Sequence, residues 1–244
     1  MSPMVAVLKR ELKSYFLTPV AYVFIVIFLI TANAFAFYLG GLYERGQADL
    51  NPFFTFHPWL FLFLVPALSM RLWAEERKSG SIELLMTLPI QTWQAVIGKF
   101  LAAWLFTGLA VGLTFPIWIT INILGDPDNG AIFAAYIGSV LMAGGFLAVG
   151  SCISALTKNQ VIAFVISVGL CFILLAAGHP MILALFSKWA PQALVDGVAS
   201  LSFLTHFESI SKGVIDLRDL VYFCLLIAAS VYATTLVLSI KQAD

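Results

Sequence analysis

Few residues of this sequence could do chemistry, and their spacing matches no catalytic or metal-binding motif. The three histidines, His57, His179 and His206, are far apart, and no H-E-x-x-H pair occurs. The three cysteines lack the spacing of a metal site or a redox pair, so we interpret them as small core residues. No G-x-x-x-x-G-K-[ST] loop is present to hold ATP phosphates. We therefore expect no enzyme activity, no metal site and no cofactor in this chain.

Charged residues are concentrated in one stretch, residues 74–92, whose sequence is AEERKSGSIELLMTLPIQT. It opens with two carboxylates and two cations, where a long apolar segment ends. The pair Glu75 and Glu76 could start the E-E-x-x-x-R motif of membrane-bound prenyl proteases, but that motif needs an arginine where Gly80 stands. An intramembrane enzyme is therefore disfavoured.

A short helix is predicted to follow this charged cluster. The run Ser79-Gly80-Ser81 interrupts one helix and offers N-caps to another, and Pro89 would end that helix before the next one starts near Thr92. Apolar side chains occur within residues 81–88 at positions 82, 84, 85 and 88. Such a surface needs a cover. Either a protein partner docks on it, or the helix packs against the protein's own helices or the membrane surface.

The rest of the chain has the composition of a protein that lies in lipid. Of the 244 residues, 61% are hydrophobic and only 11% are charged, whereas a soluble domain has roughly 25% charged residues. The formal net charge is zero, so nothing indicates a nucleic-acid partner. The length fits one compact membrane domain without a second, soluble one.

Six segments are long and apolar enough to cross a bilayer, which takes about 20 residues of helix. They are residues 20–39, 53–72, 96–124, 132–156, 161–178 and 220–240. Open strand edges are not tolerated in lipid, so we expect an all-α polytopic membrane protein. The first segment could instead be a cleaved signal peptide, because Ala32-Asn33-Ala34 is similar to a cleavage site, but its apolar run continues past that point.

The distribution of lysine and arginine predicts that both termini are cytoplasmic. In that orientation nine of these residues are inside and four, Arg45, Lys188, Lys212 and Arg218, are outside. The nine inside are Lys9, Arg10, Lys13, Arg71, Arg77, Lys78, Lys99, Lys158 and Lys241. Residues 74–92 then form a cytoplasmic loop.

The segment before the first span, residues 2–16, is predicted to be an amphipathic helix within an N-terminal unit of residues 1–19. Ser2 can cap it, and Pro3 suits its first position. Its apolar side chains recur at helical spacing while its basic ones lie off that stripe, so it would lie flat at the cytoplasmic interface. The alternative is a cytoplasmic extension of the first span. Residues 20–244 would form the membrane domain.

The long outer connection, residues 179–218, is rich in apolar residues and is interrupted by prolines and a glycine. We expect short re-entrant helices there, which dip into the outer leaflet or cap the bundle. Asp216, followed by Asp219, suits the N-terminus of the last span and its positive dipole end.

Small residues on the third and fourth spans predict close helix packing in lipid. Gly108 and Gly112 form a G-x-x-x-G pattern, and Gly144, Gly145 and Ala148 lie on the next span. They could form a dimer face or a moving helix pair, or they could serve packing within the chain.

No charged residue is predicted near the middle of a span. Ion-coupled carriers and proton relays usually place acids, bases or histidines there. Their absence leaves no ion to couple to, so energy would have to arrive through another subunit.

Residues 75–90 resemble the signature loop of ABC type-2 transporter permeases. The matching residues are Glu75, Glu76, Arg77, Gly80, Ser81, Glu83, Leu84, Leu85, Thr87 and Pro89. A second stretch, residues 206–223, is similar to the gliding-motility GldF and nitrous-oxide-cluster NosY branch of that family. It has Lys212-Gly213 where the branch has Arg-Gly.

The resemblance implies the permease subunit of an ATP-driven exporter in the bacterial inner membrane. It implies a second permease copy or a related permease as partner, with spans one, two and five at the interface. It also implies a separate ABC ATP-binding subunit, which holds ATP and magnesium and grips the helix at 81–88 as a coupling helix. The alternative is an ABC-type assembly or anchoring component, of the gliding-motility or cofactor-maturation type, that moves no small solute itself.

Overall fold

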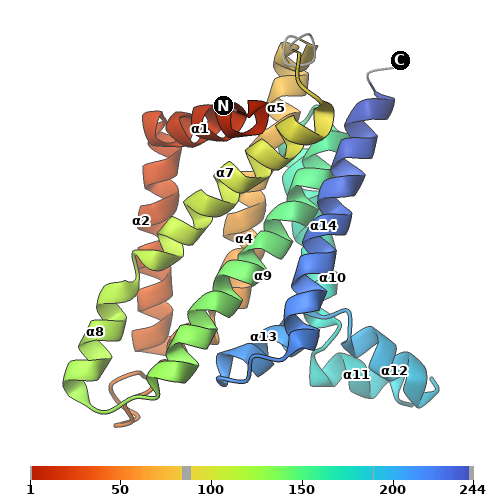
Figure 1. Ribbon diagram of the computed structural model, residues 1–244. Helices are drawn as coiled ribbons and strands as arrows, with labels where there is room; N and C mark the ends of the chain where they lie inside the picture. Colours follow the sequence, from red (N-terminus) through yellow and green to blue (C-terminus); the bar gives the residue numbers. More distant parts are fainter. Residues whose placement is uncertain (1, 84–88, 189, 242–244) are drawn as a thin grey trace.

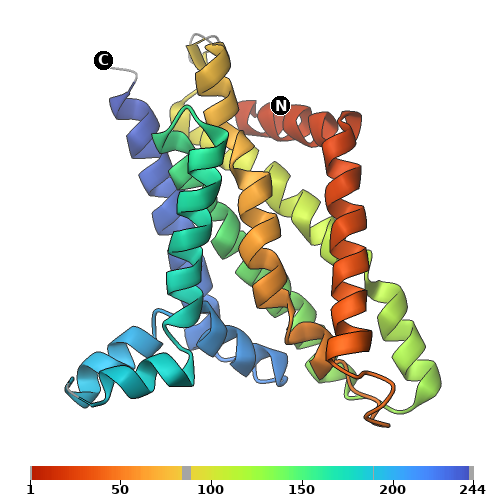
Figure 2. The same cartoon turned by 180° about the vertical axis from the view of Figure 1, so that it is seen from behind.

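Every regular element of the computed structural model is a helix, across the residues that it describes, 2–83, 89–188 and 190–241. The prediction of an all-α fold is confirmed for this part of the chain. Long helices run side by side, one helix lies across one end of the bundle, and short helices lie across the other (Figures 1 and 2). We call the end that carries α1 and Lys241 the terminal end, and the end that carries α11, α12 and α13 the distal end.

The bundle is made by long helices that are in part broken into two. They are α2 (Pro19–Ala34) with the π-helical turn η1 (Phe35–Leu39), α4 (His57–Ser69) with α5 (Arg71–Ser79), α7 (Thr92–Gly112) with α8 (Phe115–Leu124), α9 (Asn129–Leu156), α10 (Gln160–Ala176) and α14 (Leu217–Ile240). The shorter helices are α1 (Pro3–Leu17), α3 (Asn51–Phe54), α11 (Pro180–Phe186), α12 (Gln192–Ala199) and α13 (Phe203–Ser211).

Five stretches of the described chain are long and apolar enough to cross a membrane. They are Pro19–Leu39, Asn51–Ser79, Thr92–Leu124, Asn129–Leu156 and Leu217–Ile240. Each covers one of the predicted spans. The predicted span at 161–178 is the apolar helix α10, which has 17 residues and is shorter than a typical span of about 20. Five spans are therefore supported, and the count of six stays a prediction.

Helix α9 is the centre of the bundle and packs against α4, α5, α7, α10, α13 and α14. Its glycines permit these contacts, because a side chain would collide with the neighbouring helices. A Cβ on Gly145 would lie 2.6 Å from the ring of Phe203, and a Cβ on Gly144 would lie 2.7 Å from Nε1 of Trp104. Ala148 is fully buried on the same helix. These three residues thus lie inside the chain's own packing.

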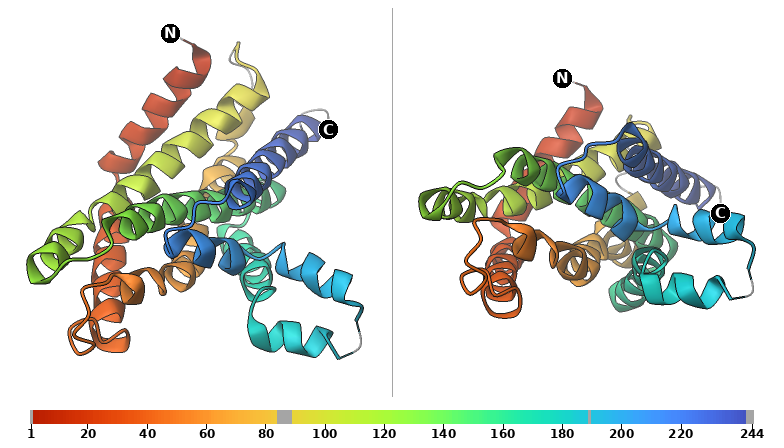
Figure 3. Two further views of the ribbon diagram at one scale, coloured as in Figure 1. Left: turned by 60° about the horizontal axis from the view of Figure 1, so that its bottom comes forward. Right: turned by 90° about the horizontal axis from the view of Figure 1, so that it is seen from below.

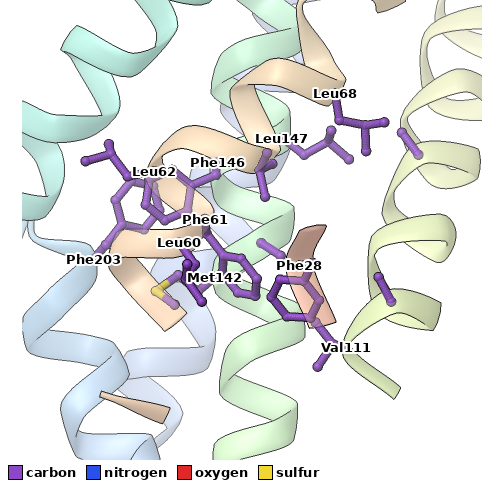
Figure 4. Close-up of a cluster of buried hydrophobic side chains, with 14 of the residues drawn as sticks. Phe28, Leu60, Phe61, Leu62, Leu68, Val111, Met142, Phe146, Leu147 and Phe203 are labelled. Carbon is purple, nitrogen blue, oxygen red and sulfur yellow. The ribbon is translucent and has the colours of Figure 1, made fainter. Parts of the chain in front are cut away.

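Large apolar side chains fill the space between α9 and its neighbours (Figure 4). The ring of Phe146 stacks on Phe203 of α13 with centroids 4.5 Å apart. Phe28 of α2 stacks on Phe61 of α4 at 5.8 Å. The core therefore joins the first helices of the bundle to the short helices of the distal end.

Helix α1 is a separate element that lies across the terminal end (Figure 1). Extended backbone at Thr18 divides it from α2, so α1 and the first span are not one continuous helix, and the position of α1 at the membrane interface stays a prediction. Pro3 occupies its first turn as predicted, but the side chain of Ser2 makes no cap hydrogen bond, so that part of the prediction is wrong. Its buried residue Val7 packs on Gly98 of α7, where a Cβ would lie 3.0 Å from the Cβ of Val7.

The connection predicted at 179–218 contains α11, α12 and α13, which lie across the distal end. In Figure 3, α11 and α12 form a hairpin that projects beyond the other helices. The prediction of short helices in this segment is confirmed, and their insertion into a leaflet stays a prediction.

Candidate functional site

The charged loop begins where α5 ends, at Gly80, whose backbone conformation favours glycine. Gly80 has a φ of 74°, the left-handed conformation that commonly ends helices. A Cβ there would meet nothing within 4 Å, so the backbone conformation and not crowding requires the glycine. Helical structure resumes at Ser81 and continues to Glu83. The chain therefore changes direction at Gly80, between α5 and the loop.

The predicted helix at 81–88 lies in part outside the described residues, which resume at Pro89. Leu84, Leu85 and Thr87 belong to the part that is not described, so the coupling helix stays a prediction. A reciprocal pair of side-chain and backbone hydrogen bonds between Gln91 and Gln94 then starts α7 at Thr92. The predicted helix start near Thr92 is confirmed.

A buried lysine of α7 holds α1 and α5 together below this loop. Nζ of Lys99 lies 2.6 Å from Oε1 of Glu76 in α5 and 3.6 Å from Oε2 of Glu11 in α1. It also donates to the carbonyl of Leu72 at 3.2 Å and lies 5.0 Å from the ring centre of Trp73. The side chain of Lys99 is only 4% exposed. We call Lys99, Glu76 and Glu11 the three-helix junction.

Sequence reasoning placed Lys99 among the cytoplasmic charges and missed its burial. A signal was present, because Val96 and Ala103 share its face of the helix at positions i−3 and i+4 and are both buried. A lysine within an apolar stripe indicates a charged partner on another helix. The identity of that partner could not be read from any local pattern.

Burial makes the junction sensitive to the loss of any member. Taking a charge out of water costs several kcal/mol, and only an oppositely charged partner offsets the cost. In contrast, the exposed pair of Arg71 and Glu75, 4.0 Å apart and one turn from each other in α5, contributes little. Oε2 of Glu76 has no hydrogen-bond partner among the described residues. The junction therefore contributes to stability, and one of its carboxylate oxygens lacks a hydrogen-bond partner among the described residues.

The aromatic ring of Tyr15 closes the α1 side of this region. It stacks on Phe106 of α7 with centroids 5.0 Å apart. Burial, and then the neighbouring charge of Glu11, raise the pKa of the Tyr15 hydroxyl well above its usual value. Tyr15 is therefore neutral at physiological pH and acts as an apolar wall with one polar tip.

A second set of contacts fixes α5 to the end of α9. Ser154 Oγ accepts hydrogen bonds from the backbone N–H groups of Trp73 and Ala74, and it donates to the carbonyl of Met70. Arg77 donates to the carbonyl of Ala155 at 2.7 Å. The hydrogen bonds of Ser154 provide partners for backbone groups at the break between α4 and α5.

The residue directly after α14, Lys241, also reaches the end of α9. Lys241 donates to the carbonyl of Leu156 at 2.9 Å. Burial, and then the charges of Arg77 and Lys158, lower the pKa of Lys241. Cations at this position complement the negative end of the α9 dipole. Four helices of the bundle are thus tied together near the charged loop.

The sequence matches the family described as ABC-2 family transporter protein over residues 6–241. This chain belongs to that family. It is accordingly the membrane component, or permease subunit, of an ABC transporter, and the match includes the whole of the three-helix junction. No curated protein matches the sequence.

Two glycines that were predicted to pack helices lie on an open side of the permease. Gly108 and Gly112 of α7 line an apolar cavity of about 450 Å³ between α7 and α9, together with Trp104, Tyr136 and Val140. A Cβ on Gly112 would meet nothing within 4 Å. The described residues leave the surface around Gly108 and Gly112 uncovered, whereas Gly144 and Gly145 are in close contact with side chains of neighbouring helices.

At the distal end, the permease has a buried pair that sequence reasoning missed. Nδ1 of His206 lies 2.6 Å from Oδ1 of Asp219, and its Nε2 lies 3.0 Å from the carbonyl of Ser200. The predicted N-cap is confirmed, because Asp216 accepts from the N–H of Arg218. Asp219, however, is buried and pairs with His206 rather than only facing the helix dipole. The two are thirteen positions apart in the sequence, so no helical spacing indicated the pair.

Ionisable residues of the described chain do not form a site for a metal ion. No group of three or more His, Cys, Asp or Glu side chains is placed to hold one. The ionisable clusters of this permease join helices, and their chemistry is that of charge pairing.

Proposed function

We propose that this permease takes its driving force from a separate ABC ATP-binding subunit that grips residues 81–88 as a coupling helix. The observation that carries the proposal is the three-helix junction, in which Lys99 binds both Glu76 and Glu11. A force on the loop would reach α5 through Gly80. It would then reach α1 and α7 through buried charges that resist separation.

The orientation that this proposal requires is the one that the lysine and arginine distribution predicts, with both termini cytoplasmic. The terminal end then faces the ATP-binding subunit, which would hold ATP and magnesium. The same subunit would meet the exposed basic side chains of α1, Lys9, Arg10 and Lys13. Export from the inner membrane, and membership of the GldF- and NosY-like branch, are part of this proposal.

A second permease, either another copy or a related chain, would pair with this one. Helices α2 and α10 support this, because both expose large apolar side chains along their length. Ile27 and Ile30 of α2 and Val165 and Ile173 of α10 are among these side chains. Closure of two ATP-binding subunits would then tilt two permeases against each other.

The test is co-purification of the ATP-binding subunit with variants of the loop. Glu83→Lys and Leu85→Asp should each reduce the amount of ATP-binding subunit that is retained, because a docking surface tolerates neither a reversed charge nor a buried carboxylate. Glu44→Lys makes the same charge change on an exposed residue outside the loop and serves as the matched control.

The permease variants themselves should remain monodisperse in detergent, since Glu83 is exposed. Full retention of the ATP-binding subunit by both loop variants would show that the coupling helix is assigned wrongly.

A further inference from the structure

A cavity of about 270 Å³ lies beneath α1 and beside the three-helix junction. Helix α2 forms one side, α4 and α5 form the other, and Lys99 of α7 lines it as well. Figure 2 shows α1 lying across the top of this region, where α2 stands apart from α4 and α5.

The wall of this cavity is divided by chemistry along the bundle. Val20, Ala21, Ala67 and Leu68 make the part toward the middle of the bundle apolar. Arg71 and Glu75 lie one and two helical turns further toward the terminal end. A ligand that fits both parts has a hydrocarbon portion and a charged head.

The charges of the wall favour a head that contains a cation. Three carboxylates, Glu11, Glu75 and Glu76, face two cations, Arg71 and Lys99. Lys99 is already bound to Glu76 and Glu11. Arg71 and Glu75 are 4.0 Å apart with side chains 43% and 57% exposed, so they are weakly paired and open to a ligand.

Arg71 and Glu75 together suit a head with a phosphate and a primary ammonium. A guanidinium binds phosphate through a planar fork of donors, and a carboxylate accepts from an ammonium. A quaternary ammonium donates no hydrogen bond and is recognised by aromatic cages. The aromatic ring in this wall is Tyr15, which stacks on Phe106. A head with only negative charge would leave the excess carboxylate unmatched.

We propose that this cavity binds a phospholipid of the phosphatidylethanolamine class, with the phosphate on Arg71, the ammonium on Glu75 and an acyl chain along Val20 and Leu68. The lipid would fill the space between α1, α2 and α5. This inference depends on the cavity and not on the coupling helix, so the two proposals can fail separately.

The test uses the full-length permease, purified by limited delipidation from an equimolar mixture of phosphatidylethanolamine, phosphatidylcholine and phosphatidylglycerol. Retained lipids are counted by mass spectrometry. Phosphatidylethanolamine should be enriched at least about tenfold over phosphatidylcholine, the order expected for one net hydrogen bond to a charged group. The double variant Arg71→Gln/Glu75→Gln should lose this enrichment.

The matched control is Glu44→Gln/Arg45→Gln, which removes the same two charges from exposed positions that do not line the cavity. Equal retention of the three lipids by the unmodified protein, or an enrichment that persists in the Arg71/Glu75 variant, would overturn the proposal.

A second arm separates a lipid from a water-soluble source of the same head. O-phosphoethanolamine at millimolar concentration should not displace the retained lipid, because it cannot use the apolar wall. Displacement would overturn the assignment of a lipid. Binding of the ATP-binding subunit, measured on the same samples, should be unaffected by Arg71→Gln alone, because Arg71 lines the cavity and lies outside the signature loop. Its loss in that variant would contradict the independence of the two sites.

Discussion

The two ends of this permease each contain a buried cluster of ionisable side chains, but the clusters are built differently. At the terminal end, one lysine is shared by two carboxylates on two other helices, beside a cavity. At the distal end, His206 and Asp219 form a compact pair, and both ring nitrogens of His206 have a partner. The ring of Tyr222 also stacks on His206 at 4.0 Å.

The difference indicates different duties. A charge shared by three helices holds them together when they move, and the adjacent cavity leaves space for that movement. The pair between α13 and α14 joins only two helices and fixes one geometry, although Oδ2 of Asp219, like Oε2 of Glu76, has no hydrogen-bond partner among the described residues. We infer that the terminal end transmits movement and that the distal end holds its helices in place.

The largest effect is expected from Lys99→Met, which keeps the length of the side chain and removes its charge. Glu76 would then lie largely buried without a cation, while Glu11 would keep only its pair with Arg10 at 2.6 Å. Removing one partner of a buried pair costs about 3–5 kcal/mol. The melting temperature of the permease should fall, and the permease should no longer stimulate ATP hydrolysis by the ATP-binding subunit. Thermal unfolding and ATP hydrolysis in the reconstituted complex measure the two effects.

A double variant separates lost charge from lost packing. Lys99→Met/Glu76→Gln should recover a large part of the lost stability, because one unpaired carboxylate has been neutralised. If the double variant is no more stable than Lys99→Met alone, the junction does not act through charge pairing.

A smaller effect is expected from Asp219→Asn, which keeps the shape of the side chain and removes the charge facing His206. The loss should be about 1.5–3 kcal/mol, the range for a hydrogen bond that involves a charged group. Thermal unfolding measures it. Stimulation of the ATP-binding subunit should be unchanged at a temperature where the variant is folded. Equal loss of stimulation in Asp219→Asn and Lys99→Met would remove the proposed contrast between the two ends.

The parts of the fold that the sequence predicted are those that depend on local properties. Apolar length predicted six spans, of which five are supported, Pro3 predicted the start of α1, and Asp216 predicted the cap of α14. A hydrophobic run or a cap is complete within a few neighbouring residues, so it can be read without knowing the fold. The predicted span at 161–178 is the 17-residue helix α10, which ends at Ala176 shortly before Gly178 and Pro180.

The parts that could not be predicted depend on contacts between distant residues. Lys99 meets Glu76 from 23 positions away, and it meets Glu11 from the N-terminal helix. Charges at the ends of apolar runs look alike in sequence whether they face water or each other. Only the way in which α1 lies across α7 brings Glu11 to Lys99, and that arrangement is a property of the whole bundle.

The most direct test of the central claim, that α1 and α5 move as one unit when nucleotide binds, is a pair of distances in the reconstituted complex. Spin labels on exposed positions replace Lys13 of α1, Lys78 of α5 and Leu124 of α8, in a background without the native cysteines. On ATP binding, the distance between positions 78 and 124 should change by at least the ~1–2 Å of a helix shift. The distance between positions 13 and 78 should stay the same. A fixed distance between 78 and 124, or an equal change between 13 and 78, would contradict the account.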